Sequence, residues 1–204
     1  MHATPKNLSG AKSERSSAIR PRYRWRVVDI VTAAILAVVV GVLFWAWGLA
    51  WTPLSVVLGV LPGFAGVLNG PWLIAGVLGA LIIRKPGAAL FTELLAATVS
   101  ALIGSQWGFS TLISGLIQGL GAEIVFAIFA YSQWRLWVAV LAGIGSSIAL
   151  AANDLIVWYP GADSLFQTIY LVTSIISGAV VAGFGSWAIV QGLSRAGALR
   201  AFRR

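Results

Sequence analysis

The stretch VVDIVTAAILAVVVGVLFWAWGLA, residues 27–50, decides the class of fold. Its 24 residues include one charged side chain, Asp29, which lies close to the start of the run. A helix that crosses a bilayer needs about 20 predominantly apolar residues. The run is also longer than the apolar region of a cleaved signal peptide, which has about 7–15 residues. It therefore predicts a membrane-spanning helix from about Arg26 to Trp51.

The composition extends this prediction to the whole chain. Of its 204 residues 59% are hydrophobic and 10% are charged, whereas an average soluble domain has about 25% charged residues. Further apolar runs predict helices that end at Arg84 or span about Ala88 to Ser105, Ser110 to Tyr131, Leu136 to Trp158 and Phe166 to Leu193. We expect an all-α, polytopic membrane protein with about six transmembrane helices in residues 25–195.

The segment 51–71 interrupts this pattern. It is apolar, but six helix-breaking or small polar residues divide it: Pro62, Gly63, Gly66, Asn69, Gly70 and Pro71. Irregular backbone at membrane depth is tolerated where it is buried in protein or lines a cavity. The sequence therefore predicts an outer, partly helical gating segment between the first two helices.

The positive charge lies at the ends of the predicted spans. The formal net charge is +8, and half of the 14 basic residues precede the first apolar run: Lys6, Lys12, Arg15, Arg20, Arg22, Arg24 and Arg26. The others are Arg84, Lys85, Arg135, Arg195, Arg200, Arg203 and Arg204. Basic residues at span ends orient helices with their positive side in the cytoplasm. We expect a multi-pass plasma-membrane protein with cytoplasmic tails at 1–24 and 196–204, in contact with anionic lipid rather than nucleic acid.

Several chemistries lack their residues. The chain has no cysteine and a single histidine, His2, so neither a histidine-based triad nor a zinc site is expected. It has no phosphate-binding loop of the form G-x-x-x-x-G-K-[ST]. The sequence predicts neither an enzyme nor a metal site, and the chain is not expected to bind ATP through a phosphate-binding loop of its own.

The acids within the predicted spans are the candidates for function, because a carboxylate at the bilayer centre costs about 2.5–3.5 kcal/mol on insertion scales. Asp154 and its neighbour Asn153 lie about one turn from the outer end of their helix. Gln118 lies below the outer end of the preceding helix, with Glu123 deeper. These four residues are expected to bind a ligand, although a structural role for Glu123 is equally open. Glu93 is expected to be a structural hydrogen-bond partner or a second polar site.

Aromatic residues gather at the predicted outer ends, where Trp51, Trp107, Trp158 and Tyr159 lie. Interfacial belts of Trp and Tyr would explain them, and so would an aromatic ligand pocket. Small residues repeat in the first helix, at Ala33, Ala37 and Gly41. This spacing allows close approach of another helix, which belongs either to this chain or to a separate subunit.

Four motifs carry a family resemblance. They are Arg84-Lys85-Pro86-Gly87-Ala88-Ala89, Glu93-Leu94-Leu95-Ala96-Ala97, Gly104-Ser105-Gln106 and Gln118-Gly119-Leu120-Gly121-Ala122-Glu123. Together they resemble the YkoE family, substrate-binding S components of energy-coupling factor (ECF) vitamin transporters that are associated with thiamine or its hydroxymethylpyrimidine precursor. The resemblance extends over the predicted helices and leaves out the N-terminal tail.

The resemblance implies a bundle of six helices with an outer vitamin pocket, covered by a loop after the first helix. It implies docking through Ala33, Ala37 and Gly41 to a transmembrane coupling subunit that two cytoplasmic ATPases drive. Two alternatives remain open. One is an S component for another vitamin, and the other is a stand-alone secondary transporter in which Glu93 or Glu123 carries protons. A purely structural membrane subunit would bind no small molecule.

Overall fold

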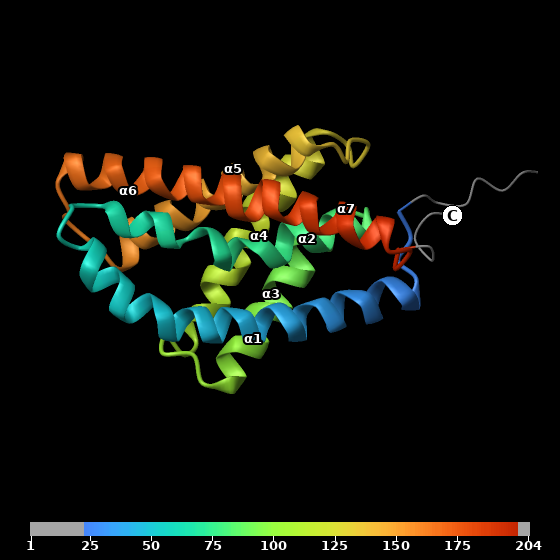
Figure 1. Cartoon of the computed structure of the whole chain (residues 1–204), viewed down its shortest axis with the longest axis horizontal. Helices are drawn as coiled ribbons and strands as arrows, with labels where there is room; N and C mark the ends of the chain where they lie inside the picture. Colours follow the sequence, from blue (N-terminus) through green and yellow to red (C-terminus); the bar gives the residue numbers. More distant parts are fainter. Residues whose placement is uncertain (1–22, 200–204) are drawn as a thin grey trace, which may run out of the picture.

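The computed structural model describes residues 23–199, and within them the chain is helical, with no β-strand. The helices are α1 (Val27–Leu58), α2 (Ile74–Ile83), α3 (Ala88–Ile103), α4 (Ser110–Ile128), α5 (Leu136–Val157), α6 (Ser164–Ser177) and α7 (Ser186–Arg195). A π-helical stretch, Gly178–Gly185, joins α6 to α7 in one long helical segment (Figure 1). The predicted all-α fold is confirmed. Most of the two predicted tails, residues 1–22 and 200–204, lie outside the described residues.

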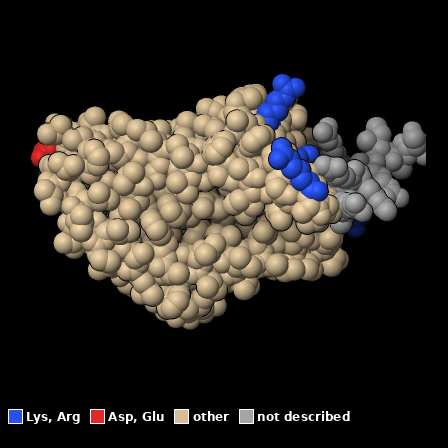
Figure 2. All heavy atoms as spheres, viewed as in Figure 1, with Lys and Arg blue, Asp and Glu red and all other residues tan. Residues whose placement is uncertain are grey.

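Length and composition allow four of these segments to cross a membrane: Val27–Leu58, Ser110–Ile128, Leu136–Val157 and Ser164–Arg195. Two further apolar helical segments, Gly70–Ile83 and Ala88–Ile103, are shorter. Figure 2 shows lysine and arginine at one end of the molecule, an acidic side chain at the other and uncharged surface between them. We call the first of these the basic end; it carries the start of α1 and the end of α7 (Figure 1).

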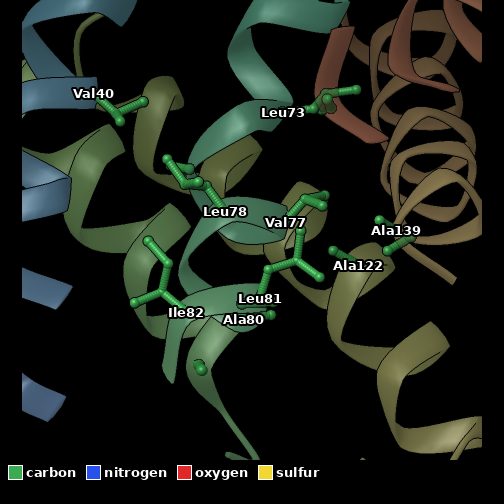
Figure 3. Packing of buried hydrophobic residues seen from close by; sticks show 14 of the residues in the cluster. Val40, Leu73, Val77, Leu78, Ala80, Leu81, Ile82, Ala122 and Ala139 are labelled. Carbon is green, nitrogen blue, oxygen red and sulfur yellow. The ribbon is translucent and has the colours of Figure 1, made fainter. Parts of the chain in front are cut away.

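Helix α2 forms the centre of the bundle. Every residue from Ala75 to Ile83 is buried, as expected for a helix that is hydrophobic on all sides. Helices α1 and α3, the π-helical stretch and α7 surround it. Val77 and Leu81 of α2 lie beside Ala122 of α4 in this core (Figure 3). Because α2 is enclosed by protein, it needs no lipid-facing surface.

The small residues of α1 pack inside the chain. Ala33 and Ala37 have 0% exposed surface. A Cβ atom on Gly41 would lie 2.7 Å from the Ala96 carbonyl oxygen of α3, so only glycine permits this approach of the two helices. The predicted docking surface at these residues is therefore corrected, since they are buried against the protein's own helices and present no face to another subunit.

The predicted gating segment begins later than its sequence pattern suggested. Helix α1 continues through Pro53 to Leu58, so that Trp51 lies within the helix. Two 3₁₀ turns, Phe64–Leu68 and Gly70–Leu73, then lead to α2. Because Gly63, Gly66 and Gly70 have no side chain, this segment lies directly against the backbone of α6.

The basic end contains a buried ion cluster. Asp29 is fully buried and pairs with Arg26 at 3.1 Å and with Lys85, which follows α2. The Trp25 indole N–H donates to the Pro86 carbonyl oxygen at 2.9 Å. These contacts hold the start of α1 against the α2–α3 connection. The two basic side chains also offset the negative charge of Asp29, which would otherwise be buried without a partner.

Candidate ligand-binding site

A cavity of about 290 Å³ lies within the part of the bundle far from the start of α1. This volume is at the lower end of the range of roughly 300–1,000 Å³ for small-molecule pockets. Its wall is formed by the segment between α1 and α2 (residues 59–73), by helices α1, α3, α4, α5 and α6, and by the α3–α4 and α5–α6 connections. The lining residues are Phe44, Trp51, Asn69, Trp72, Ala97, Ser100, Ser105, Trp107, Ser110, Thr111, Ser114, Gln118, Leu150, Asp154, Trp158, Tyr159 and Tyr170.

Three tryptophans form one wall of this cavity. The ring centroid of Trp107 lies 5.6 Å from that of Trp51 and 5.2 Å from that of Trp72, with edge-to-face geometry in both pairs. Trp51 and Trp72 are 6.2 Å apart. Aromatic rings at these separations stabilise one another. Because the three rings pack against one another, they are already in place at the cavity wall before a ligand binds.

Asp154 supplies the carboxylate of the cavity. Its Oδ2 atom accepts a hydrogen bond of 2.7 Å from the hydroxyl of Tyr170 on α6. The Tyr170 oxygen in turn accepts from the side-chain amide of Asn69 at 3.0 Å. The second N–H of that amide donates to Ser174 Oγ at 3.0 Å. This network ties the 59–73 segment, α5 and α6 together at the cavity wall.

Gln118 lies at the other polar side of the cavity. The Glu93 Oε1 atom and the Trp72 carbonyl oxygen are both acceptors, so the amide is assigned with its nitrogen toward them, and this nitrogen donates to each at 3.1 Å. Glu93 is fully buried, and its Oε2 atom accepts from the Gly76 N–H in the first turn of α2 at 2.6 Å. A carboxylate at a helix N-terminus is stabilised by the unpaired backbone N–H groups and the helix dipole. Glu93 thus links α2 to Gln118.

Six of the residues predicted for a ligand site line this cavity: Trp51, Trp107, Gln118, Asp154, Trp158 and Tyr159. Two of the predicted residues do not. The Asn153 side chain lies beside the cavity carboxylate, where its nitrogen donates to Asp154 Oδ1 at 3.5 Å. Asn153 therefore supports Asp154 from α5 and lies outside the cavity lining.

Glu123 has a different place from the predicted one. Its carboxylate accepts hydrogen bonds from the backbone N–H groups of Gly87, Ala89 and Leu90, at 2.6, 2.9 and 3.2 Å. The Tyr131 hydroxyl adds a fourth bond at 2.8 Å. Since no side chain of α3 itself caps that helix, Glu123 of α4 performs this role. The prediction that Glu123 lies in the pocket is thus corrected.

Burial and the adjacent Glu123 carboxylate raise the pKa of Tyr131 above its ordinary value. The hydroxyl therefore stays protonated throughout the physiological pH range and keeps donating to the carboxylate.

Among the lining residues that sequence reasoning missed, three belong to the aromatic cluster or the polar network of the cavity: Asn69, Trp72 and Tyr170. Asn69 was noted only as an interruption of an apolar segment. Trp72 follows it closely, and both belong to irregular backbone, whose direction no helical period predicts. Tyr170 lies on α6 one turn beyond Phe166, with which it stacks at 5.8 Å. A single polar residue flanked by Gly and Pro at membrane depth was the available signal for this part of the site.

The arrangement suits noncovalent binding of a small aromatic or heteroaromatic molecule. It combines tryptophan and tyrosine rings with one carboxylate, two amides and several hydroxyls. Within residues 23–199 no group of three or more His, Cys, Asp or Glu side chains is placed to hold a metal ion.

The structure resembles a solved one described as "Crystal structure of an S-component of ECF transporter". The two superimpose with a TM-score of 0.82 and share 36% sequence identity, and the match covers 87% of this chain and 90% of the other. The fold is therefore that of an S component, the class of membrane protein that the cavity and helix arrangement also suggest.

Sequence comparison then defines the family. The chain is 37% identical over 181 residues to the Bacillus subtilis (strain 168) protein named "Putative HMP/thiamine permease protein YkoE", covering 86% of this chain and 87% of that protein. Residues 28–149 also match the family model described as "ABC-type cobalt transport system, permease component". The chain belongs to the YkoE family, as its motifs indicated, and is a membrane transport protein.

Proposed function

We propose that this protein is the substrate-binding subunit of an ATP-driven ECF transporter, and that it captures thiamine or its hydroxymethylpyrimidine precursor from outside the cell. The observation that carries the proposal is the cavity itself, in which the tryptophan cluster Trp51, Trp72 and Trp107 faces the same space as Asp154. The name of the Bacillus subtilis relative supports the choice of ligand.

The chemistry of thiamine matches the groups present. Its thiazolium ring carries a fixed positive charge, which a carboxylate such as Asp154 offsets and which tryptophan faces attract. Its aminopyrimidine ring offers N–H donors and a flat π-surface. Hydroxymethylpyrimidine retains the second set of interactions and lacks the first, so a shared pocket would bind both.

Capture from outside follows from the position of the charges. If the basic end faces the cytoplasm, the opposite end, toward which Trp51 of α1 and the connections that carry Trp107 and Trp158 lie, faces outward. The chain would carry no cofactor, and ATP would be hydrolysed by two partner ATPases acting through a transmembrane coupling subunit. Because Ala33, Ala37 and Gly41 are buried, this docking would use another lipid-facing surface of the bundle.

The direct test is a titration of the purified, detergent-solubilised chain with thiamine, followed by tryptophan fluorescence and with hydroxymethylpyrimidine as the competitor. The chain has ten tryptophans, and four of them line the cavity, so an occupied cavity is expected to change the emission saturably. Calorimetry on the same sample detects a ligand that binds without an optical signal. A folded sample that gives no response by either method would overturn the thiamine assignment.

The stand-alone proton-coupled transporter has no comparable support. Its two candidate proton carriers, Glu93 and Glu123, are both held by backbone N–H groups outside the cavity lining. Uptake by the chain alone in liposomes, driven by a proton gradient, would be its distinguishing result.

A further inference from the structure

We propose that the cavity recognises its ligand through hydrogen-bond acceptors that the protein fixes in advance, and that Glu93, outside the cavity, is the positioning residue for one of them. The inference rests on the proposed function, which supplies the ligand class. It adds a selection rule: the site accepts a ring that carries an amino group and rejects the same ring with an oxo group in that position.

The first acceptor is the side-chain carbonyl of Gln118. An amide side chain has two N–H donors and one carbonyl oxygen, and its orientation is assigned from the surrounding hydrogen bonds. Here both N–H donors are used, by Glu93 Oε1 and the Trp72 carbonyl oxygen. A backbone carbonyl can only accept, so the atom that faces Trp72 O must be nitrogen whatever the protonation state of Glu93. The Gln118 carbonyl oxygen is then the polar atom left for the cavity.

The second acceptor is the side-chain carbonyl of Asn69. An ionised Asp154 accepts the Tyr170 hydroxyl proton, so the Tyr170 oxygen must itself accept from Asn69. Ser174 takes the other Asn69 N–H. Within residues 23–199 the Asn69 carbonyl oxygen accepts no hydrogen bond, and the one fully sealed side-chain polar atom without a partner is Thr92 Oγ1. The Asn69 oxygen is therefore open to the cavity that this residue lines.

Together with the Asp154 carboxylate, these two oxygens give the cavity three acceptors whose orientation is set by buried partners. Because the N–H groups of Gln118 and Asn69 already donate to protein atoms, neither side chain can turn its nitrogen to the ligand without breaking two hydrogen bonds. A ligand acceptor placed opposite them would leave buried polar atoms unpaired, which is the strongest basis for discrimination between similar ligands. The complementary ligand edge is an amino group with its N–H donors.

The experiment compares thiamine with oxythiamine, in which an oxo group replaces the 4-amino group of the pyrimidine. Both compounds carry the same thiazolium charge, so the comparison isolates the hydrogen-bonding edge. We expect the wild-type chain in detergent to bind thiamine at least tenfold more tightly by calorimetry. Equal affinity for the two would overturn the inference and leave the proposed function standing, whereas binding of neither would overturn both.

Two variants locate the discrimination. Gln118→Met keeps the length of the side chain and removes the acceptor, so the preference for thiamine should fall at least threefold. In Glu93→Gln, the side chain has one acceptor oxygen for two donors, Gly76 N–H and the Gln118 amide. The Gln118 side chain should therefore lose its fixed orientation, and the preference for thiamine over oxythiamine should fall. A merely structural role for Glu93 would lower both affinities together and leave their ratio unchanged.

The matched control is Glu123→Gln, the same substitution at another buried carboxylate that accepts backbone N–H bonds outside the cavity. It should leave the thiamine-to-oxythiamine ratio at the wild-type value. If Glu93→Gln does not yield folded protein, Gln118→Met decides alone, and an unchanged ratio in that variant would refute the role of the Gln118 carbonyl.

Discussion

At the scale of single residues, three carboxylates in an apolar bundle have two different roles. Glu93 and Glu123 each satisfy backbone N–H groups at the start of a helix, α2 and α3 respectively. Asp154 receives hydroxyl and amide donors from its neighbours and faces a cavity. Depth along a predicted helix could not distinguish these roles, because each depends on which backbone atoms of other helices lie opposite.

Asp154→Asn is expected to weaken thiamine binding by about two- to thirtyfold, and hydroxymethylpyrimidine binding less. The reason is that a hydrogen bond to a charged group contributes about 1.5–3 kcal/mol and one between neutral groups about 1 kcal/mol, with 1.4 kcal/mol for each tenfold in affinity. Calorimetric titration with both compounds measures the difference.

Asp163→Asn is the matched control for this variant. Asp163 caps α6 by accepting from the Phe166 N–H at 2.8 Å, it lies outside the cavity lining, and asparagine is an equally good cap. Both affinities should stay at wild-type values. An Asp154→Asn protein that bound thiamine as tightly as the wild type would remove this carboxylate from the site.

Glu123→Gln should reduce stability without changing affinity. Glutamine offers one acceptor oxygen where the carboxylate serves three backbone N–H groups and Tyr131, so buried donors lose their partners at a cost of about 1–3 kcal/mol. Thermal unfolding in detergent should show a lower Tm, while thiamine affinity at low temperature stays constant. A loss of affinity in fully folded protein would return Glu123 to the binding site.

At the scale of helices, the sequence allowed most elements to be predicted and left their packing open. The runs from Ala88, Ser110 and Leu136 became α3, α4 and α5 because their lengths and flanking Gly, Pro or Arg residues mark helix ends. The stripe at Ala33, Ala37 and Gly41 predicted a close helix contact correctly but could not name the partner helix. The irregular segment that supplies Asn69 and Trp72 was visible only as a break in the pattern, since tertiary contacts with α6 determine its path.

The packing of α1 gives a test at this scale. Ala37→Leu should lower the Tm of the isolated chain, because inserting a larger side chain into a closely packed contact costs about 1–3 kcal/mol. Val38→Leu, next to it but 53% exposed, should leave the Tm nearly unchanged. An isolated Ala37→Leu chain with wild-type stability that fails only to associate with a coupling subunit would instead favour a docking role.

At the scale of the whole molecule, charge and aromatic residues define two ends, and composition alone predicted a membrane protein. The orientation of those ends is testable because the chain has no native cysteine. Ser164→Cys and Ser132→Cys place single thiols at exposed positions on the two ends. In intact cells a membrane-impermeant maleimide should label Ser164→Cys, and it should label Ser132→Cys only after permeabilisation. The reverse pattern would place the basic end outside.

The most direct test of the central claim is an experimental structure of the protein determined with thiamine bound. The account predicts ligand density in the cavity between Trp107 and Asp154, with the pyrimidine amino group within hydrogen-bond distance of at least one of Asn69, Gln118 and Asp154. The account would be contradicted if this cavity were empty and the thiamine density lay elsewhere. One such place is the bundle surface, and another is a separate pocket lined in part by Ser55, Val56 and Gly59.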